Sequence, residues 1–352
     1  MRLSKINFTV KPDEPGYWEI QDVLLGDFNL IVASNATGKT RFLNIISTLA
    51  KIFTNEIDPF NGSWRVEFKD EQIVYRYELE INHNIIVKEI LWSGNNLLLK
   101  RHKDTGKIYS FEKNETLDFS PPQNEITLNV RKSIKEYPYL ESLYSWAYNL
   151  LRYNFSGVIP QHISIPYNRA SLLENLNTIP YLLRELIEDK EVMSRIVKDV
   201  ASMGYEVEGL GVKTDQMGFN ELCMISIKEK DLVYDILQPH MSDGMFRALS
   251  LLIIMEHILS SDSEYTVLVD DINEGLDYDR SSKLLSVLLN KIHGTNVQLI
   301  LTTNDRNLIN SVAIKYINLF ERHGSVIKVF NHSNSKGKYG DFILSGLDKI
   351  CN

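Results

Sequence analysis

Three consecutive residues near the start of the chain, Gly38, Lys39 and Thr40, have the types and the order needed to hold a phosphate group. A phosphate loop needs backbone N–H groups directed at phosphate oxygens, a lysine for the β and γ charges, and a hydroxyl for Mg²⁺. The apolar run "FNLIV" precedes these residues, and "RFLNIISTLAKIF" follows them with apolar residues at helical spacing. The pattern predicts a strand, a phosphate loop and a helix that bind ATP and Mg²⁺.

The predicted nucleotide-binding loop departs from the usual pattern at its first position. Ala33 stands where that pattern has its first glycine. A methyl group fits there if the residue keeps a negative φ. The loop is therefore predicted to consist of Ala33, Ser34, Asn35, Ala36, Thr37, Gly38, Lys39, Thr40 and Arg41.

A second group of candidate residues ends the apolar segment "YTVLVDD", far along the chain from the loop. A carboxylate at the tip of a buried strand beside a phosphate loop is a common second anchor for Mg²⁺, and the next carboxylate can polarise the attacking water. We expect Mg²⁺ on Thr40 and Asp270, and Asp271 as the catalytic carboxylate. The chain between loop and strand is long enough to form a large insertion across the sheet.

The segment "HMSDGMFRALSLLIIMEHIL" lies between the two elements and is typical of a capped, nearly fully buried helix. Its start, "SDGMFR", resembles the signature motif of ABC-type ATPases. In that motif a serine and a glycine at a helix N-terminus face a phosphate across a dimer interface. The resemblance assigns Ser242, Asp243 and Gly244 to the nucleotide of a second subunit. Arg247 is expected to brace the motif.

The order of the elements extends this resemblance to nearly the whole chain. The segments "LSKINF", "MSDGMFR", "VLVDD", "LILTTND" and "DFILSGLD" resemble stand-alone ATPases of the SMC, RecF and OLD group. The resemblance implies a D-loop at "EGLD" with Asp277, and a Q-loop glutamine at Gln161 or, as the second choice, Gln123.

Two catalytic positions depart from that group's pattern. Asp271 stands where relatives usually have a glutamate, one methylene longer, which implies slower turnover. Asn304 stands where many relatives have a switch histidine. Its amide can donate a hydrogen bond to the γ-phosphate but cannot carry a positive charge.

The periodicity of the whole chain predicts an α/β fold of the ABC-type P-loop ATPase kind, with a mixed or parallel core sheet, an antiparallel β lobe and a helical insertion. Alternation from Ser63 to Lys113 predicts an antiparallel meander. Helical spacing predicts helices over 139–154 and 178–200. The last third is predicted to alternate helices and buried strands, at 244–260, 265–269, 278–292, 297–302 and 326–330.

These elements suggest three parts of the chain. They are an N-terminal ATPase lobe at 1–130, a helical insertion or lid at 131–220, and a C-terminal ATPase lobe at 221–352. No sustained heptads occur, so the insertion is expected to be a short lid or docking surface rather than a coiled coil.

Composition narrows the class of protein. A net charge of −8 argues against a chain that is basic all over and coats nucleic acid. Cys223 and Cys351 are the only cysteines, which fits a reducing compartment and offers no metal cluster. The apolar block 248–255 is too short to span a bilayer, and the N-terminus has no signal-like apolar stretch. We therefore expect a cytoplasmic protein with no membrane partner.

The resemblance implies an ATP hydrolase that works as a nucleotide-gated homodimer, or as a higher oligomer, with ATP sandwiched between subunits. Compact relatives act with a separately encoded effector, a nuclease or another toxin, in prokaryotic anti-phage defence. Two alternatives stay open. One is a RecF-like or SMC-like repair or recombination ATPase that binds DNA directly, and the other is an ATP-binding scaffold with little turnover.

Overall fold

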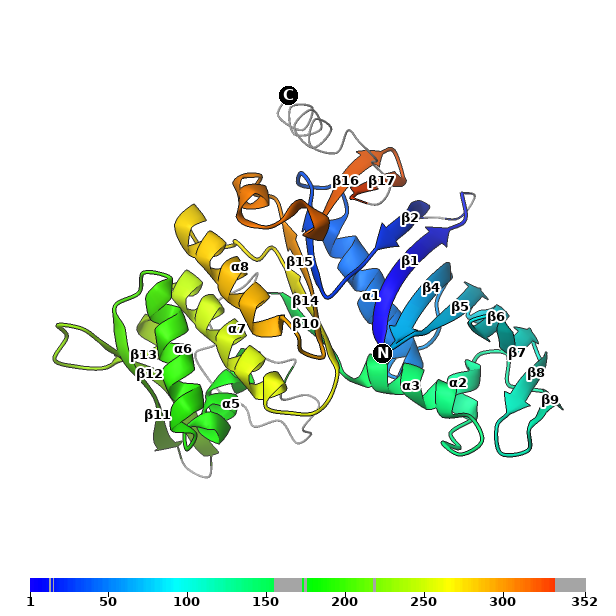
Figure 1. Ribbon diagram of the computed structural model, residues 1–352, viewed down its shortest axis with the longest axis horizontal. Helices are drawn as coiled ribbons and strands as arrows, with labels where there is room; N and C mark the ends of the chain where they lie inside the picture. The colour runs from blue at the N-terminus through cyan, green and yellow to red at the C-terminus, as the bar shows by residue number, and fades with distance from the viewer. Residues whose placement is uncertain (13, 15, 155–172, 174–175, 218–219, 333–352) are drawn as a thin grey trace.

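The computed structural model describes residues 1–12, 14, 16–154, 173, 176–217 and 220–332, without the side chains of 215–222. Its main feature is a 14-stranded mixed sheet (Figure 1). Five strands at one end of this sheet are parallel, in the order β10-β14-β15-β3-β16. These strands are β3 (Phe28–Val32), β10 (Leu150–Asn154), β14 (Tyr265–Asp270), β15 (Val297–Thr303) and β16 (Ile317–His323).

The parallel strands are buried on both faces because helices cover each side. Helix α1 (Lys39–Phe53) packs on one face, together with Ile31, Leu268 and Ile300. Helices α7 (Asp243–Leu259) and α8 (Tyr278–Ile292) cover the opposite face (Figure 1). The helix that follows the predicted phosphate loop and the helix that begins at the predicted signature therefore lie on opposite faces of one sheet.

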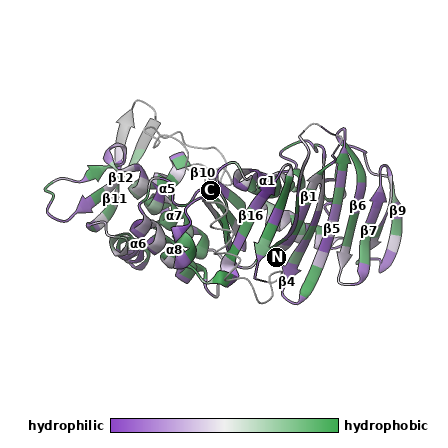
Figure 2. Cartoon of the chain, turned by 90° about the horizontal axis from the view of Figure 1, so that it is seen from above, coloured by the Kyte–Doolittle hydropathy of each residue, from purple (hydrophilic) through white to green (hydrophobic). Residues whose placement is uncertain are grey.

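Beyond β16 the sheet continues through β17 (Val326–Asn331), which is antiparallel to β16 and parallel to β2 (Trp18–Leu24). Beyond β2, strand β1 (Arg2–Val10) leads into a meander that confirms the predicted antiparallel lobe. Apolar and polar residues alternate along these strands (Figure 2). The meander strands are β4 (Gly62–Asp70), β5 (Ile73–Asn82), β6 (Ile85–Ser93), β7 (Asn96–His102), β8 (Thr105–Ser110) and β9 (Glu115–Phe119).

The predicted helix 139–154 is wrong in its second part. Helix α3 (Pro138–Tyr148) ends before Asn149, and the next five residues form β10, which pairs with β14. The short α2 (Thr127–Val130) precedes α3, which packs against α1. The parallel pairing of β10 with a strand more than a hundred residues later overrides the local helical pattern.

The predicted helix 178–200 is divided into two. Helix α5 (Ile179–Leu186) ends, and Asp189 then caps α6 (Lys190–Ser202) by accepting hydrogen bonds from the backbone of Glu191 and Val192. Both helices pack against α7. The division of the chain at residues 130 and 220 stays a prediction.

A small antiparallel sheet was not anticipated from the sequence. It consists of β11 (Val207–Met217), β12 (Asn220–Glu229) and β13 (Ile236–Leu237), and it packs against α5 and α6. This sheet and β9 lie at opposite ends of the molecule (Figure 2). None of the helices in the described residues is long and apolar enough to cross a membrane.

Candidate active site

The predicted phosphate loop leaves the carboxyl end of β3. Ala33 is buried, donates its N–H to the carbonyl of Thr303 at 3.3 Å, and has a negative φ. The left-handed positions of the loop are instead Ala36, with φ 62°, and Gly38, with φ 113°. Alanine at the first position therefore costs no backbone strain, whereas Ala36 holds a conformation that is unfavourable for a residue with a Cβ.

Gly38 is required for two reasons. Its positive φ favours glycine, and a Cβ there would lie 3.2 Å from Cζ2 of Trp18. Trp18 is itself buried, at the start of β2. The indole therefore sets the position at which the loop turns into α1.

Helix α1 begins without the features that neutralise its positive end. No side chain caps it, and no acidic residue lies in its first turn. Helices α6, α7 and α8 have both features, with caps from Asp189, Ser242 and Asp277 and first-turn acids at Glu191, Asp243 and Asp279, whereas the shorter α2 and α5 lack both, as α1 does. The free N–H groups and the uncompensated helix dipole make the start of α1 suited to an anion.

Lys39 is held inside this loop. Its side chain is 6% exposed, and Nζ donates to the carbonyls of Ala33 at 3.3 Å and Ser34 at 3.4 Å. Nζ also lies 3.9 Å from Oδ1 of Asp271. Burial lowers the pKa of Lys39, while Asp271 and Asp270 act in the opposite direction. The ammonium group therefore stands where it can reach phosphate oxygens, supported by carbonyls rather than by a tight ion pair.

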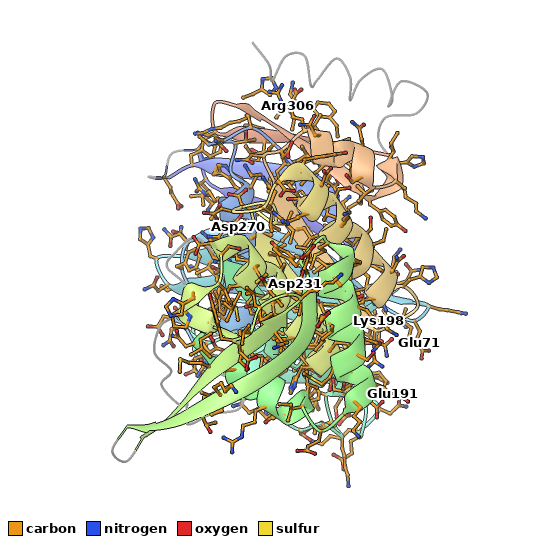
Figure 3. The ribbon with its side chains drawn as sticks, turned by 90° about the vertical axis from the view of Figure 1, so that its left-hand side faces the viewer. Glu71, Glu191, Lys198, Asp231, Asp270 and Arg306 are labelled. Carbon is orange, nitrogen blue, oxygen red and sulfur yellow. The ribbon has the colours of Figure 1, made fainter. Side chains whose placement is uncertain are left out.

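The two aspartates predicted from the sequence are positioned by one threonine. Asp270, labelled in Figure 3, ends β14, and its Oδ1 accepts a hydrogen bond of 2.7 Å from Oγ1 of Thr302. The same Oγ1 accepts from the backbone N–H of Asp271 at 2.9 Å. Thr302 therefore fixes both residues from the neighbouring strand β15. Sequence reasoning missed it, although the Thr-Thr pair at the carboxyl end of a buried strand was a usable signal.

Asp271 has a strained backbone and a carboxylate oxygen that accepts no hydrogen bond from the described residues. Its φ is 45°, and its carbonyl accepts from the N–H of Glu274 in the turn that follows. Oδ1 is buried and makes no hydrogen bond among the described residues. Burial raises the pKa of Asp271; Lys39 opposes this rise, and Asp270 and Glu274 add to it. This oxygen is an acceptor directed at the space beside Lys39.

Asn304 connects the loop to the turn after β14. Its Nδ2 donates to Oδ1 of Asn35 at 3.0 Å, and its Oδ1 accepts from Nδ2 of Asn273 at 3.4 Å. Oδ1 of Asn273 in turn accepts from Oγ1 of Thr303 at 2.7 Å. Asn273 and Thr303 were not singled out from the sequence, because neither residue type is specific to such a role.

The predicted signature residues gather at the start of α7. Oγ of Ser242 caps the helix by accepting from the N–H of Met245 at 3.3 Å, and both Ser242 and Asp243 are exposed. A Cβ on Gly244 would lie 2.2 Å from the carbonyl oxygen of Gly275, so the helix start and the turn after β14 are in backbone contact. Arg247 is buried and forms an ion pair with Glu274 at 3.6 Å.

The remaining predicted residues have separate environments. Asp277 caps α8 by accepting from the N–H of Arg280, a bond that lowers the pKa of its carboxyl group. Gln161 lies outside the described residues, seven positions after β10, whose last residue pairs with Asp270. Gln123 donates to Asp104 at 3.1 Å, in the turn between β7 and β8.

The residues at the loop fit a magnesium–nucleotide complex better than a bare metal ion. No cluster of three histidine, cysteine, aspartate or glutamate side chains able to hold a metal occurs in the described part of the chain. Thr40 is exposed at the start of α1, and Asp270 is the nearby buried carboxylate. One hydroxyl and one carboxylate are a common protein contribution to Mg²⁺ when phosphates and water supply the rest.

Comparisons with known proteins identify the fold. No family model and no curated protein matches the chain. The crystal structure of an SmcHead bound to the C-winged helix domain of ScpA aligns with a TM-score of 0.58 at 12% identity, over 97% of this chain and 100% of that one. A Smc head domain from Pyrococcus furiosus, with an extended coiled coil and the C-terminal domain of ScpA, aligns over 100% of both chains with a TM-score of 0.50 at 12% identity. The chain has the ABC-type fold of SMC head domains, which confirms the predicted fold class.

Proposed function

We propose that the protein binds ATP with Mg²⁺ in the loop 33–41 and hydrolyses it. One observation carries the proposal. Lys39 is the first residue of an uncapped helix whose first turn has no acid, and its buried amino group faces Asp271 at 3.9 Å. A cation at the positive end of a helix, with a carboxylate beyond it, has the charges needed for phosphate and its metal ion.

The chemistry follows from this arrangement. The N–H groups of the loop and Lys39 bind the β- and γ-phosphates, and Thr40 and Asp270 hold Mg²⁺, which neutralises phosphate charge. Oδ1 of Asp271, which lacks a hydrogen-bond donor among the described residues, orients the attacking water. Asn304 lies within 3.0 Å of the loop residue Asn35 and senses the γ-phosphate through its amide.

The signature residues complete the site of a second copy of the chain. Within one chain, α1 and α7 cover opposite faces of the sheet, and Ser242 makes no hydrogen bond with the described loop. A homodimer that sandwiches ATP brings the exposed start of α7 to the partner's loop. Because closure requires the γ-phosphate, hydrolysis releases the dimer.

The dimer regulates a separately encoded effector, a nuclease or another toxin, in cytoplasmic anti-phage defence. The sequence resemblance to compact ATPases of that kind supports this role. The insertion also supports it, because α5 and α6, of 8 and 13 residues, fold back on α7 instead of extending as a coiled coil. A DNA repair or recombination role would require ATP-dependent binding to duplex DNA with steep salt dependence.

A scaffold with little turnover is the second candidate, and one observation favours it. Asp271 is shorter than the glutamate of relatives and has a raised pKa, so it is a weaker partner for water at acidic pH. Turnover itself distinguishes the two candidates.

The test is Mg²⁺-dependent ATP hydrolysis by the purified chain, with the oligomeric state measured by light scattering without nucleotide, with ADP and with ATP. We expect hydrolysis and an ATP-dependent dimer. ATP binding without hydrolysis or a change of assembly would favour the scaffold. No ATP binding would refute the proposed function.

A further inference from the structure

Two arginines lie beside the phosphate loop on the side away from the aspartates. Arg41 follows Thr40 in the first turn of α1. Its Nη2 donates to the carbonyl of Gly16 at 2.7 Å, and its guanidinium lies 5.0 Å from the centre of the Trp18 ring. A carbonyl and an aromatic face hold the group in place without neutralising it.

Arg322 approaches the loop from the end of β16. Its Nη1 donates to the carbonyl of Ala36 at 2.9 Å, and its Nε donates to the carbonyl of Gly324 at 2.7 Å. Ala36 is the strained, left-handed residue of the loop. Arg322 is therefore attached to the backbone that is predicted to surround phosphate.

Arg41 belongs to the loop 33–41 and Arg322 contacts the backbone of the same loop, so the two positive charges act on each other. Among the described residues, neither Arg41 nor Arg322 forms an ion pair with a carboxylate. Burial lowers the pKa of Arg41, and the charge of Arg322 lowers it further. Like charges kept together in this way are unfavourable unless an anion joins them.

The sheet order shows which part of a nucleotide this pair faces. The order β14-β15-β3-β16 places β16, which carries Arg322, on one side of the loop strand and Asp270 on the other. Trp18, beneath Arg41, begins β2, which lies further still from β14. If the γ-phosphate lies beside Asp270 and Asp271, the triphosphate extends across the loop toward the two arginines.

We propose that Arg41 and Arg322 form a guanidinium pair that binds the α-phosphate of the nucleotide. The inference rests on the proposed function and adds a subsite to it. Arginine suits this task because its planar fork donates several hydrogen bonds to phosphate oxygens and stays charged. The pair recognises phosphate charge and not the base.

The experiment measures the affinity of wild type, Arg41→Gln and Arg322→Gln for ATP, ADP and inorganic tripolyphosphate by calorimetry. Arg76→Gln is the matched control, since Arg76 also donates to a carbonyl, that of Gly94, and lies over an indole, that of Trp92, but in the meander. We expect Arg41→Gln and Arg322→Gln each to lower the affinity for all three ligands about tenfold. Arg76→Gln should leave all three affinities unchanged.

Two results would overturn the inference. If the variants bind ATP and ADP more weakly but tripolyphosphate as wild type does, the arginines contact the nucleoside instead. If all three affinities are unchanged, the pair binds no phosphate. Arg41→Lys and Arg322→Lys, with thermal unfolding measured alongside, control for misfolding, because they keep the charge and should recover part of the affinity. Absence of ATP binding by wild type would instead overturn the proposed function, and the inference with it.

Discussion

The start of α1 and the start of α7 are two helix N-termini that we assign to the same phosphates, and they are built in opposite ways. Helix α1 has no side-chain cap and no first-turn acid, and it follows a loop with a left-handed alanine. Helix α7 has both a cap from Ser242 and an acid at Asp243. In our proposal the first, with the loop 33–41, is the loop half of the site and receives the anion, whereas the second is the signature half, which is already capped and adds to a site only when another molecule approaches it.

Lys39→Ala should have the largest effect, because it removes the only buried cation of the loop half. We expect ATP affinity to fall by about a hundredfold or more and hydrolysis to be lost. Lys51→Ala, in the last turn of the same helix, is the control and should bind ATP normally. Calorimetry and a phosphate-release assay measure the two effects. Normal ATP affinity in Lys39→Ala would show that the loop 33–41 does not bind the phosphates.

Asp271→Asn separates binding from chemistry in the loop half. The amide keeps the shape but cannot act as a base, so hydrolysis should fall roughly 10²–10³-fold while ATP binding and the ATP-bound dimer persist. Since burial raises the pKa of Asp271, wild-type hydrolysis should decline with falling pH at values above the ordinary aspartate pKa of 3.8. The residual rate of Asp271→Asn should lack that decline. Asp262→Asn, in an exposed turn, is the control. Equal rates and equal pH profiles would exclude Asp271 from catalysis.

Ser242 tests the signature half without disturbing the helix. Ser242→Asp keeps a capping oxygen but places a negative charge toward the partner's γ-phosphate, whereas Ser242→Thr keeps both the cap and the hydroxyl. We expect Ser242→Asp to lose ATP-dependent dimerisation and to hydrolyse ATP about ten to a hundred times more slowly, with unchanged ATP affinity in the monomer. Ser242→Thr should resemble wild type. Light scattering measures the dimer and calorimetry measures the affinity for ATP. A lower ATP affinity of the Ser242→Asp monomer would contradict the assignment of Ser242 to the partner's nucleotide.

The smallest effect concerns an ion cluster that supports the signature half. Glu256 on α7 is buried, accepts from Arg195 of α6 at 2.8 Å and pairs with Lys291 of α8. Glu256→Gln should lower the free energy of unfolding by about 2 kcal/mol and leave ATP affinity unchanged.

The pH dependence of that cluster follows from the same contacts. Burial favours a raised pKa for Glu256, but the hydrogen bonds from Arg195 and Lys291 outweigh it and lower the pKa below 4.5. The stabilisation is therefore present above the unfolded-state pKa and is lost as pH falls through the folded-state pKa. Denaturant unfolding at several pH values measures it. The half-exposed Glu185, which pairs with His257 on α7, provides the control Glu185→Gln, which should change little. An equal loss of unfolding free energy in Glu256→Gln and Glu185→Gln would show that the buried cluster stabilises the fold no more than an exposed pair does.

The sequence was sufficient where local pattern and tertiary structure agree. The strand "FNLIV", the helix after Lys39, the strand ending at Asp270 and the helix starting at Tyr278 occur within a residue or two of their predicted positions. In each of these four elements, the run of apolar residues and the adjoining turn or cap favour the same secondary structure. The meander was predictable for the same reason, since alternation over "IVYRYELEI" fits only a half-buried strand.

Prediction failed where distant contacts decide the structure. Residues 150–154 continue a helical pattern but form β10, because pairing with β14 offers hydrogen bonds that local sequence cannot show. The hairpin β11–β12 begins with a glycine-rich strand of weak propensity. Thr302 was missed because its role comes from the adjacency of β15 and β14. The arginine pair could not be foreseen, since Arg41 and Arg322 lie far apart in the chain.

The most direct test of two half-sites on one chain is to mix two variants that are each defective in a different half. Lys39→Ala lacks the loop half, and Ser242→Asp lacks the signature half. In a mixed dimer, the loop of the Ser242→Asp chain meets the intact signature of the Lys39→Ala chain. Each mixed dimer then holds one complete site of two, so an equal mixture should hydrolyse ATP several times faster than either variant alone. No recovery, with mixed dimers shown to form, would contradict the assignment of the two helix starts to one shared site.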